Sequence, residues 1–170
     1  MTMGTVARRA HTGVAVLYRR WHNKESLVLA ALGHYREQNP VQTPDTGTLR
    51  GDLLANLTSL SSARAAVFAV AGAAYLSGLI SATPRNPEQV RMAIVGEKID
   101  PRTRPVYLRA ALRHDIELDL IPNSVLSMPF DLVSYELAMT FEPVPSSRIV
   151  EIVDDLFMPL VERHQSPGRR

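Results

Sequence analysis

Cysteine is absent from this chain of 170 residues. Its absence excludes a disulfide framework, a thiolate metal site and a cysteine nucleophile. The first residues also lack the cationic segment followed by an apolar stretch that marks a secretory signal. Together these absences predict a cytoplasmic protein.

Common catalytic motifs are missing as well. The sequence contains no G-x-S-x-G, no H-E-x-x-H, no Walker phosphate-binding loop and no dinucleotide fingerprint. Glu151, Asp154 and Asp155 fall on the polar face of the predicted last helix, where acidic side chains are usually only solvated. Acidic and apolar residues alternate after His114, but this loop lacks the tight glycine turn of a hard-metal site. We therefore expect no enzyme, no metal and no cofactor.

Strand signals are also lacking, since no hairpin pattern and no internal repeat occurs. Apolar residues instead recur at three- and four-residue spacings along most of the chain, which predicts an all-α fold. The most obvious linker covers residues 40–48 and is rich in Pro and Thr. We predict a helix-turn-helix head over residues 1–39 and a helical-bundle body, for ligand binding and dimerisation, over residues 48–163.

The body pattern begins with an amphipathic helix from Leu49 to Leu60, on which Arg50 and Asp52 should face outward. Ser61-Ser62 is then a plausible N-cap for a second helix. Residues 65–82 carry no charge, and their number would allow a marginal membrane span. Because Ala, Gly and Ser dominate this stretch and amphipathic helices flank it, we expect a buried central helix and no membrane partner.

The rest of the body should form four more helices. Asn86 is the expected N-cap of the first of them and Asp100-Pro101 that of the second, which would begin later if Pro105 interrupts its first turn. Pro129 and Pro159 should shorten or kink the last two. The predicted ranges are 88–98, 101–113, 124–140 and 146–162.

Charge is distributed unevenly between the two parts. Residues 1–36 hold six Lys and Arg against one Glu, whereas the whole chain has a net charge of only +2. A basic head on a mildly acidic body is typical of a protein that binds nucleic acid at one end. A solvated basic face without a partner is the alternative.

The run Ala10–Leu27 (AHTGVAVLYRRWHNKESL) has the pattern of a helix-turn-helix. His11-Thr12-Gly13 has turn chemistry, and the helix from Val14 to Trp21 has Leu17 and Trp21 on one inner face. Asn23 is the expected N-cap of the next helix, which should end before Pro40. In such a motif the second helix enters the major groove, which requires small or polar residues at its start and cations beside it.

The string L-Y-R-R-W-x-x-K-E-x-L-V, here Leu17–Val28, closely resembles the TetR family of bacterial repressors. The chain departs from the family pattern at the turn, where His11 replaces Gly, and at Val16, which replaces a Thr that commonly touches phosphate. Family members also carry a first helix before this point. Here Met1-Thr2 looks like the N-cap of the family's second helix, so we expect the first helix to be missing, either because the sequence starts too late or because the head is truncated.

The resemblance implies that Tyr18 and Lys24 contact backbone phosphates. Direct base reading would depend on Arg19, because the small residues at the helix start offer no side-chain hydrogen bonds. The candidate DNA-binding residues are Gly13, Val14, Ala15, Tyr18, Arg19 and Lys24.

The body resembles the ligand-binding and dimerisation half of the same family. Large side chains on its helices could line a pocket for a small apolar or amphipathic ligand, although each could equally belong to the core; they are Phe68, Tyr75, Met92, Tyr107 and Phe130. Broad apolar stripes on the last two helices predict a homodimer. The expected interface residues are Leu132, Val133, Leu137, Ile149, Ile152, Val153, Leu156 and Phe157.

The resemblance therefore implies a dimeric repressor of a palindromic operator that a small ligand releases. The alternative is a ligand-binding or protein-interaction dimer that has lost DNA binding together with its first helix. Salt-dependent binding to DNA would distinguish the two.

Overall fold

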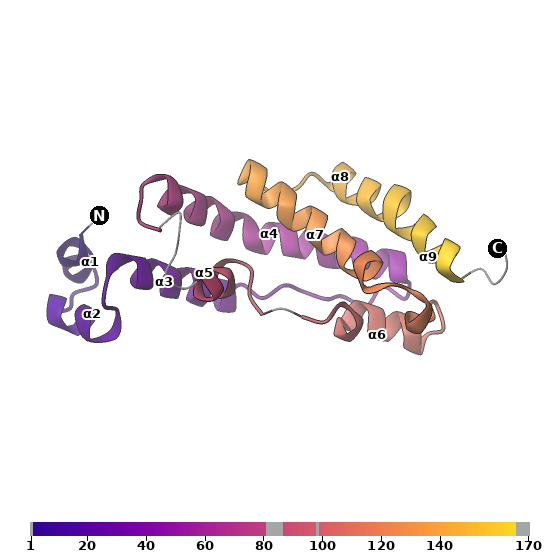
Figure 1. Ribbon diagram of the computed structural model, residues 1–170, viewed down its shortest axis with the longest axis horizontal. Coiled ribbons are helices and arrows are strands. Elements are labelled where there is room, and N and C mark those ends of the chain that lie inside the picture. Colours follow the sequence, from indigo (N-terminus) through magenta and orange to yellow (C-terminus); the bar gives the residue numbers. More distant parts are fainter. Residues whose placement is uncertain (1, 81–86, 98, 166–170) are drawn as a thin grey trace. The chain divides into compact units, whose positions relative to one another are not determined.

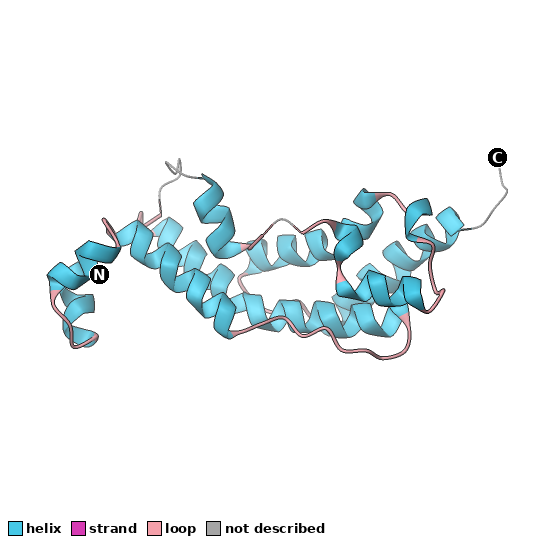
Figure 2. Cartoon of the chain, turned by 90° about the horizontal axis from the view of Figure 1, so that it is seen from below, coloured by secondary structure: helices cyan, strands magenta, loops and turns pink. Residues whose placement is uncertain are grey.

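The computed structural model describes residues 2–80, 87–97 and 99–165 (Figure 1). All regular elements within these ranges are helical and none is a strand, so the all-α prediction is confirmed (Figure 2). The elements in order are α1 (Met3–Arg9), α2 (Val14–Arg20), α3 (Lys24–Gln38), α4 (Leu49–Leu76), α5 (Pro87–Ile94), η1 (Pro101–Thr103), α6 (Pro105–Leu112), η2 (Leu118–Leu120), α7 (Asn123–Thr140), α8 (Ser146–Glu151), η3 (Ile152–Phe157) and α9 (Met158–Gln165).

The chain divides into two compact units. The head unit comprises Met1–Asn39 and Ala69–Glu97, and the body unit comprises Pro40–Phe68 and Lys98–Arg170. One unit boundary coincides with the head boundary predicted at residue 39. Residues 69–97, which the sequence pattern placed in the body, group with the head.

Side-chain caps define the starts of α1 and α3. The Thr2 hydroxyl accepts a hydrogen bond of 3.1 Å from the Thr5 amide at the start of α1. At the start of α3, Asn23 and Ser26 form a reciprocal capping box, which satisfies two amides that the helix leaves free. The predicted caps at Thr2 and Asn23 are confirmed.

The helix-turn-helix has a small core of its own. Met3, Ala7 and Leu17 are buried, and Trp21 and Leu27 pack partly buried against them. Leu17 and Trp21 therefore form the inner face of α2, as their spacing predicts. The remaining sides of α2 are left for solvent or a partner.

Helix α5 packs against α3 within the head unit. The Arg36 guanidinium of α3 donates a hydrogen bond to the Met92 carbonyl of α5. The helix ends earlier than residue 98, because Gly96 has a φ of +103° and leaves the right-handed helical region. The predicted cap at Asn86 lies outside the described residues.

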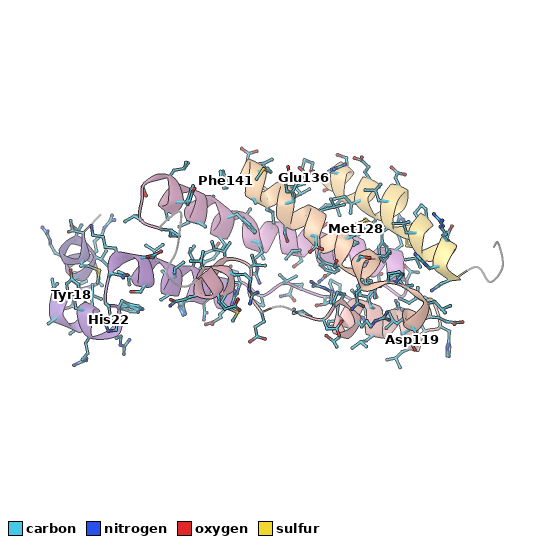
Figure 3. All side chains as sticks on the ribbon, viewed as in Figure 1. Tyr18, His22, Asp119, Met128, Glu136 and Phe141 are labelled. Carbon is cyan, nitrogen blue, oxygen red and sulfur yellow. The ribbon has the colours of Figure 1, made fainter. Side chains whose placement is uncertain are left out.

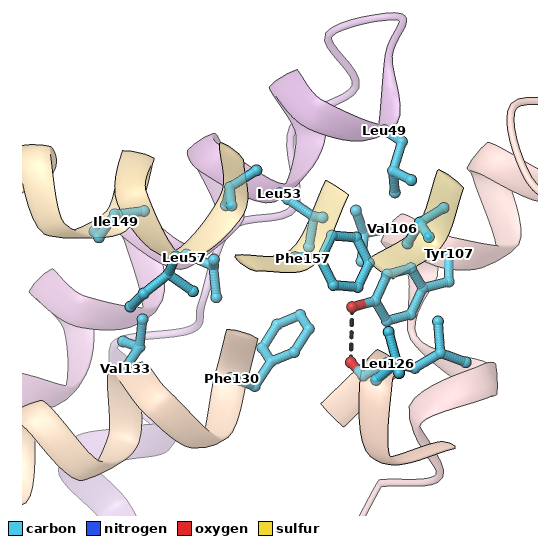
Figure 4. Close-up of a cluster of buried hydrophobic side chains, with 14 of the residues drawn as sticks. Leu49, Leu53, Leu57, Val106, Tyr107, Leu126, Phe130, Val133, Ile149 and Phe157 are labelled. Carbon is cyan, nitrogen blue, oxygen red and sulfur yellow. Dashed lines mark hydrogen bonds between the residues drawn. The ribbon is translucent and has the colours of Figure 1, made fainter. Parts of the chain in front are cut away.

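The body core is centred on Tyr107, which is fully buried (Figure 4). Its ring stacks against the Phe157 ring, with 5.9 Å between the ring centroids, and meets the Phe130 ring edge-on, with 6.2 Å between the centroids. Its hydroxyl donates to the Leu126 carbonyl at 2.7 Å, which satisfies a group that would otherwise be costly to bury. Burial raises the pKa of Tyr107 far above its ordinary range.

Helix α4 corrects two expectations. It runs without a break past Ser61, and the Ser61 hydroxyl accepts a buried hydrogen bond of 2.7 Å from the Val144 amide instead of capping a new helix. Length and composition alone would allow α4 to cross a membrane. Within its uncharged part Ala65, Val67 and Ala71 are buried while Val70 and Tyr75 are exposed, so the central helix that was expected to be buried is only partly buried.

Asp52, predicted to face outward, is fully buried. Its carboxylate accepts hydrogen bonds from the Thr46 amide at 2.6 Å, the Thr46 hydroxyl at 2.8 Å and the Arg113 guanidinium at 2.9 Å. Arg109 lies 3.6 Å from the same carboxylate and donates to the carbonyls of Thr43 and Pro44. Residues 40–48 lack regular structure. These contacts hold them against α4 and α6.

The prolines of the later helices differ in their effect. Asp100 caps η1 with Pro101 at its first position, but the predicted helix over residues 101–113 splits because Arg104, preceding Pro105, is extended. Pro129 lies inside α7 without ending it. The predicted last helix continues through η3, a π-helical segment just before Pro159. The wider turn of this π-helical segment accommodates Pro159, which has no backbone N–H to donate to the helix.

Candidate nucleic-acid interface

Helix α2 presents its outer face to solvent. Gly13 is its N-cap in an extended conformation and contributes no side-chain bond. The six candidate DNA-binding residues are all exposed, whereas Leu17 on the opposite face is 6% exposed. The structure thus brings together Gly13, Val14, Ala15, Tyr18 and Arg19 on and beside α2, with Lys24 at the first position of α3 (Figure 3 labels Tyr18).

The turn before α2 is tight and depends on one unusual backbone conformation. His11 has a φ of +50°, a region that side chains with a Cβ rarely adopt. The Thr12 amide donates to the Ala7 carbonyl at 3.0 Å and the His11 amide donates to the Arg8 carbonyl at 3.2 Å. This geometry explains physically why glycine is favoured at the position that His11 occupies.

One residue of this surface was missed by the sequence argument. Val16 is 39% exposed on α2, although it was considered only as a replacement for a phosphate-contacting Thr. Its methyl groups can contact apolar base edges such as the thymine methyl, but they cannot donate to phosphate. Its spacing of three and four residues from Arg19 and Arg20, which places it on their side of the helix, was the signal that could have identified it.

The predicted ligand residues fall in different units. Tyr75 and Met92 belong to the head unit, and Tyr75 is exposed. Phe68, Tyr107 and Phe130 belong to the body unit, where the last two contact each other. Arg104 lies over the Phe130 ring at 3.7 Å, and burial lowers its pKa. Ligand contact by these residues stays a prediction.

Most of the predicted dimer residues are covered within a single chain. Val133, Leu137, Ile149, Ile152, Val153 and Phe157 are at most 2% exposed and belong to the body core. Their side chains are therefore not available at the surface, which the breadth of the apolar stripe did not reveal. Leu132 is partly buried, and Leu156 remains 38% exposed. A dimer through these helices stays a prediction that now depends on outward-facing residues.

Comparison with known proteins decides the family. Residues 43–156 match the family model described as Tetracyclin repressor-like, C-terminal domain. Residues 1–31 match the model for bacterial regulatory proteins of the tetR family. The chain belongs to the TetR family. It is a DNA-binding transcription regulator of this family, which confirms the resemblance found in Leu17–Val28.

A relative with a known role covers almost the whole chain. It is the DNA-binding transcriptional repressor TetR of Mycobacteroides abscessus, which is 27% identical over 172 residues, covering 99% of this chain and 85% of the relative. No solved structure matches the chain. TetR-family proteins are regulators and not enzymes, and among the described residues no group of three potential ligands is placed to hold a metal ion.

Proposed function

We propose that this TetR-family protein is a cytoplasmic repressor that binds a palindromic operator as a homodimer. The observation that carries the proposal is the outward face of α2, where Tyr18 and Arg19 are exposed opposite the buried Leu17. Lys24 adds a cation at the start of the following helix. The repressor role of the relative from Mycobacteroides abscessus supports the direction of regulation.

Each residue has a defined role in the proposed complex. Tyr18 and Lys24 contact backbone phosphates and set the position of α2, while Arg19 reads base edges. Gly13, Val14 and Ala15 are small enough to let the start of α2 approach the groove floor. In a dimer the two copies of α2 then reach half-sites about one helical turn apart.

Release requires a ligand that favours a different arrangement of the two heads. We propose a small apolar or amphipathic ligand held in the body unit, which changes the separation of the two recognition helices so that they no longer match both half-sites. Phe68, Tyr107 and Phe130 are the candidate contacts of that ligand.

One observation favours a second function. Val16 and His11 depart from the family pattern at the turn and the recognition helix, which weakens the contacts inferred for DNA. Under this alternative the protein is a ligand-binding or protein-interaction dimer without DNA binding.

Selection from a pool of random DNA duplexes distinguishes the two functions. The repressor proposal predicts recovery of duplexes with two inverted half-sites about one helical turn apart. The Arg19→Ala variant should recover a different base at one position of each half-site. Recovery of no common sequence, together with no salt-dependent binding to any duplex, would favour the alternative.

A further inference from the structure

The head unit contains a cleft of about 470 Å³ between α3, α5 and the residues that end α2. A volume of this size is within the range of sites for small organic ligands. Trp21, Gly33 and Met92 are among its lining residues, and Met92 is the one predicted ligand residue that lines it. Tyr107 and Phe130 belong to the body core, so this cleft is a separate site.

The lining combines cations with apolar surface. Its ionisable side chains among the described residues are Arg20, His22 and Arg36, and none of its residues is acidic. Trp21 and Met92 supply aromatic and flexible apolar surface. Glu88 on α5 lies outside the lining and pairs with Arg91. The cleft therefore favours a negatively charged group attached to an apolar part.

Arg36 is held in place at the cleft. It donates a hydrogen bond to the Met92 carbonyl, and its guanidinium carbon lies 3.4 Å from the position that a Cβ on Gly96 would occupy. A guanidinium has five N–H donors, so the bond to Met92 leaves donors for a second acceptor. Carboxylate and sulfate groups match the guanidinium fork in geometry and charge.

Gly33 forms an open part of the cleft. A Cβ added at Gly33 would meet no atom within 4 Å, although the residue lies inside α3. A methyl group is therefore tolerated at this position, whereas a large ring would occupy space in the cleft. This difference provides a matched pair of variants.

We propose that the cleft binds a small amphipathic organic anion, with its carboxylate or sulfate at Arg36 and its apolar part against Trp21 and Met92. This goes beyond the proposed function, which places the releasing ligand in the body unit. Trp21 follows α2 directly and packs on the core of the helix-turn-helix. Occupation of the cleft therefore acts on the end of the recognition helix.

The chain contains one tryptophan, and it lines this cleft, so its fluorescence reports on binding. The test titrates the full chain with decanoate, decyltrimethylammonium and decanol below their micelle concentrations. We expect decanoate to change the Trp21 emission saturably and to bind about tenfold more tightly than the other two. Equal binding of all three probes would overturn the proposal.

Variants locate the site. Gly33→Phe should abolish the decanoate response, while Gly33→Ala should retain it. Arg36→Met keeps much of the side-chain length and should weaken decanoate binding about tenfold, and Arg163→Met in the body unit should leave it unchanged. Circular dichroism checks that each variant is folded.

The proposal fails if Gly33→Phe is folded and responds to decanoate as Gly33→Ala does. DNA binding without decanoate is measured on Arg163→Met, which changes a residue of the body unit, and should equal that of the parent. A parent that binds decanoate but no DNA would contradict the proposed function and leave the cleft assignment standing. A parent that binds DNA but shows no decanoate response would contradict the cleft assignment alone.

Discussion

The guanidinium of Arg113 donates a hydrogen bond of 2.9 Å to the carboxylate of Asp52, a side chain with no exposed surface. Burial by itself would raise the pKa of Asp52. The hydrogen bonds from Thr46 and the pairing with Arg113 outweigh that effect and hold the pKa of Asp52 below its ordinary value. The pair therefore joins α4, α6 and the segment over residues 40–48 through one buried charge.

Replacing Asp52 should destabilise the body unit. Asp52→Asn leaves Arg113 and Arg109 without their shared buried charge, so we expect the free energy of unfolding to fall by about 3 kcal/mol at neutral pH. Urea denaturation measures this change. Asp119→Asn is the control, because Asp119 is fully exposed and lies 3.7 Å from Arg102, and its replacement should change stability by less than about 0.5 kcal/mol.

The same pair gives a pH dependence with a defined sign. Since the pKa of Asp52 is lower in the folded chain than in the unfolded chain, its stabilising effect is present above the unfolded value of about 3.9. It is lost as the pH falls below that value and through the folded pKa. The parent should therefore lose more stability on acidification below about pH 4 than Asp52→Asn does. Parallel acid profiles for the two proteins would show that Asp52 is not the stabilised carboxylate.

Two adjacent serines provide a second matched pair. Ser61 is 1% exposed and accepts from the Val144 amide, while Ser62 is exposed. Ser61→Ala leaves a buried amide without an acceptor and should cost about 1–3 kcal/mol of stability. Ser62→Ala should cost less than about 0.5 kcal/mol. Equal urea midpoints for the two variants would contradict the role assigned to Ser61.

Local signals in the sequence predicted most of the helix ends. Asn23 caps α3 with a residue three positions away, so pattern and structure agree there. Asp52 and Ser61 were interpreted wrongly because each has a partner far along the chain, 61 residues away for Arg113 and 83 residues away for Val144. No local rule predicts such pairs. The cleft in the head unit was missed for the same reason, since Arg36 and Met92 meet only through the packing of α3 against α5.

The proposed dimer can be tested with two neighbouring residues. Leu156 is 38% exposed and Phe157 is fully buried. Leu156→Glu should therefore produce monomers that keep the helical circular dichroism of the parent, measured by sedimentation equilibrium. Phe157→Ala should instead cost about 3–5 kcal/mol of stability by opening a cavity in the body core.

Arg163→Glu, which changes an exposed residue of α9, is the control for an added acidic charge and should leave the dimer intact. An unchanged dimer in Leu156→Glu would remove this residue from the interface. A monomeric parent would remove the dimer itself.

DNA binding through α2 and Lys24 is the central claim, and the salt dependence of binding tests it most directly. The logarithm of the association constant for a selected duplex is measured against the logarithm of salt concentration, for the parent and for Lys24→Ala, with Arg163→Ala as a control in the body unit. The parent should bind with a steep negative slope. Lys24→Ala should make that slope shallower by about one per subunit, because binding of the variant releases one counterion fewer from the DNA. A parent that shows no salt-dependent binding, or a Lys24→Ala slope equal to that of the parent, would contradict this interface.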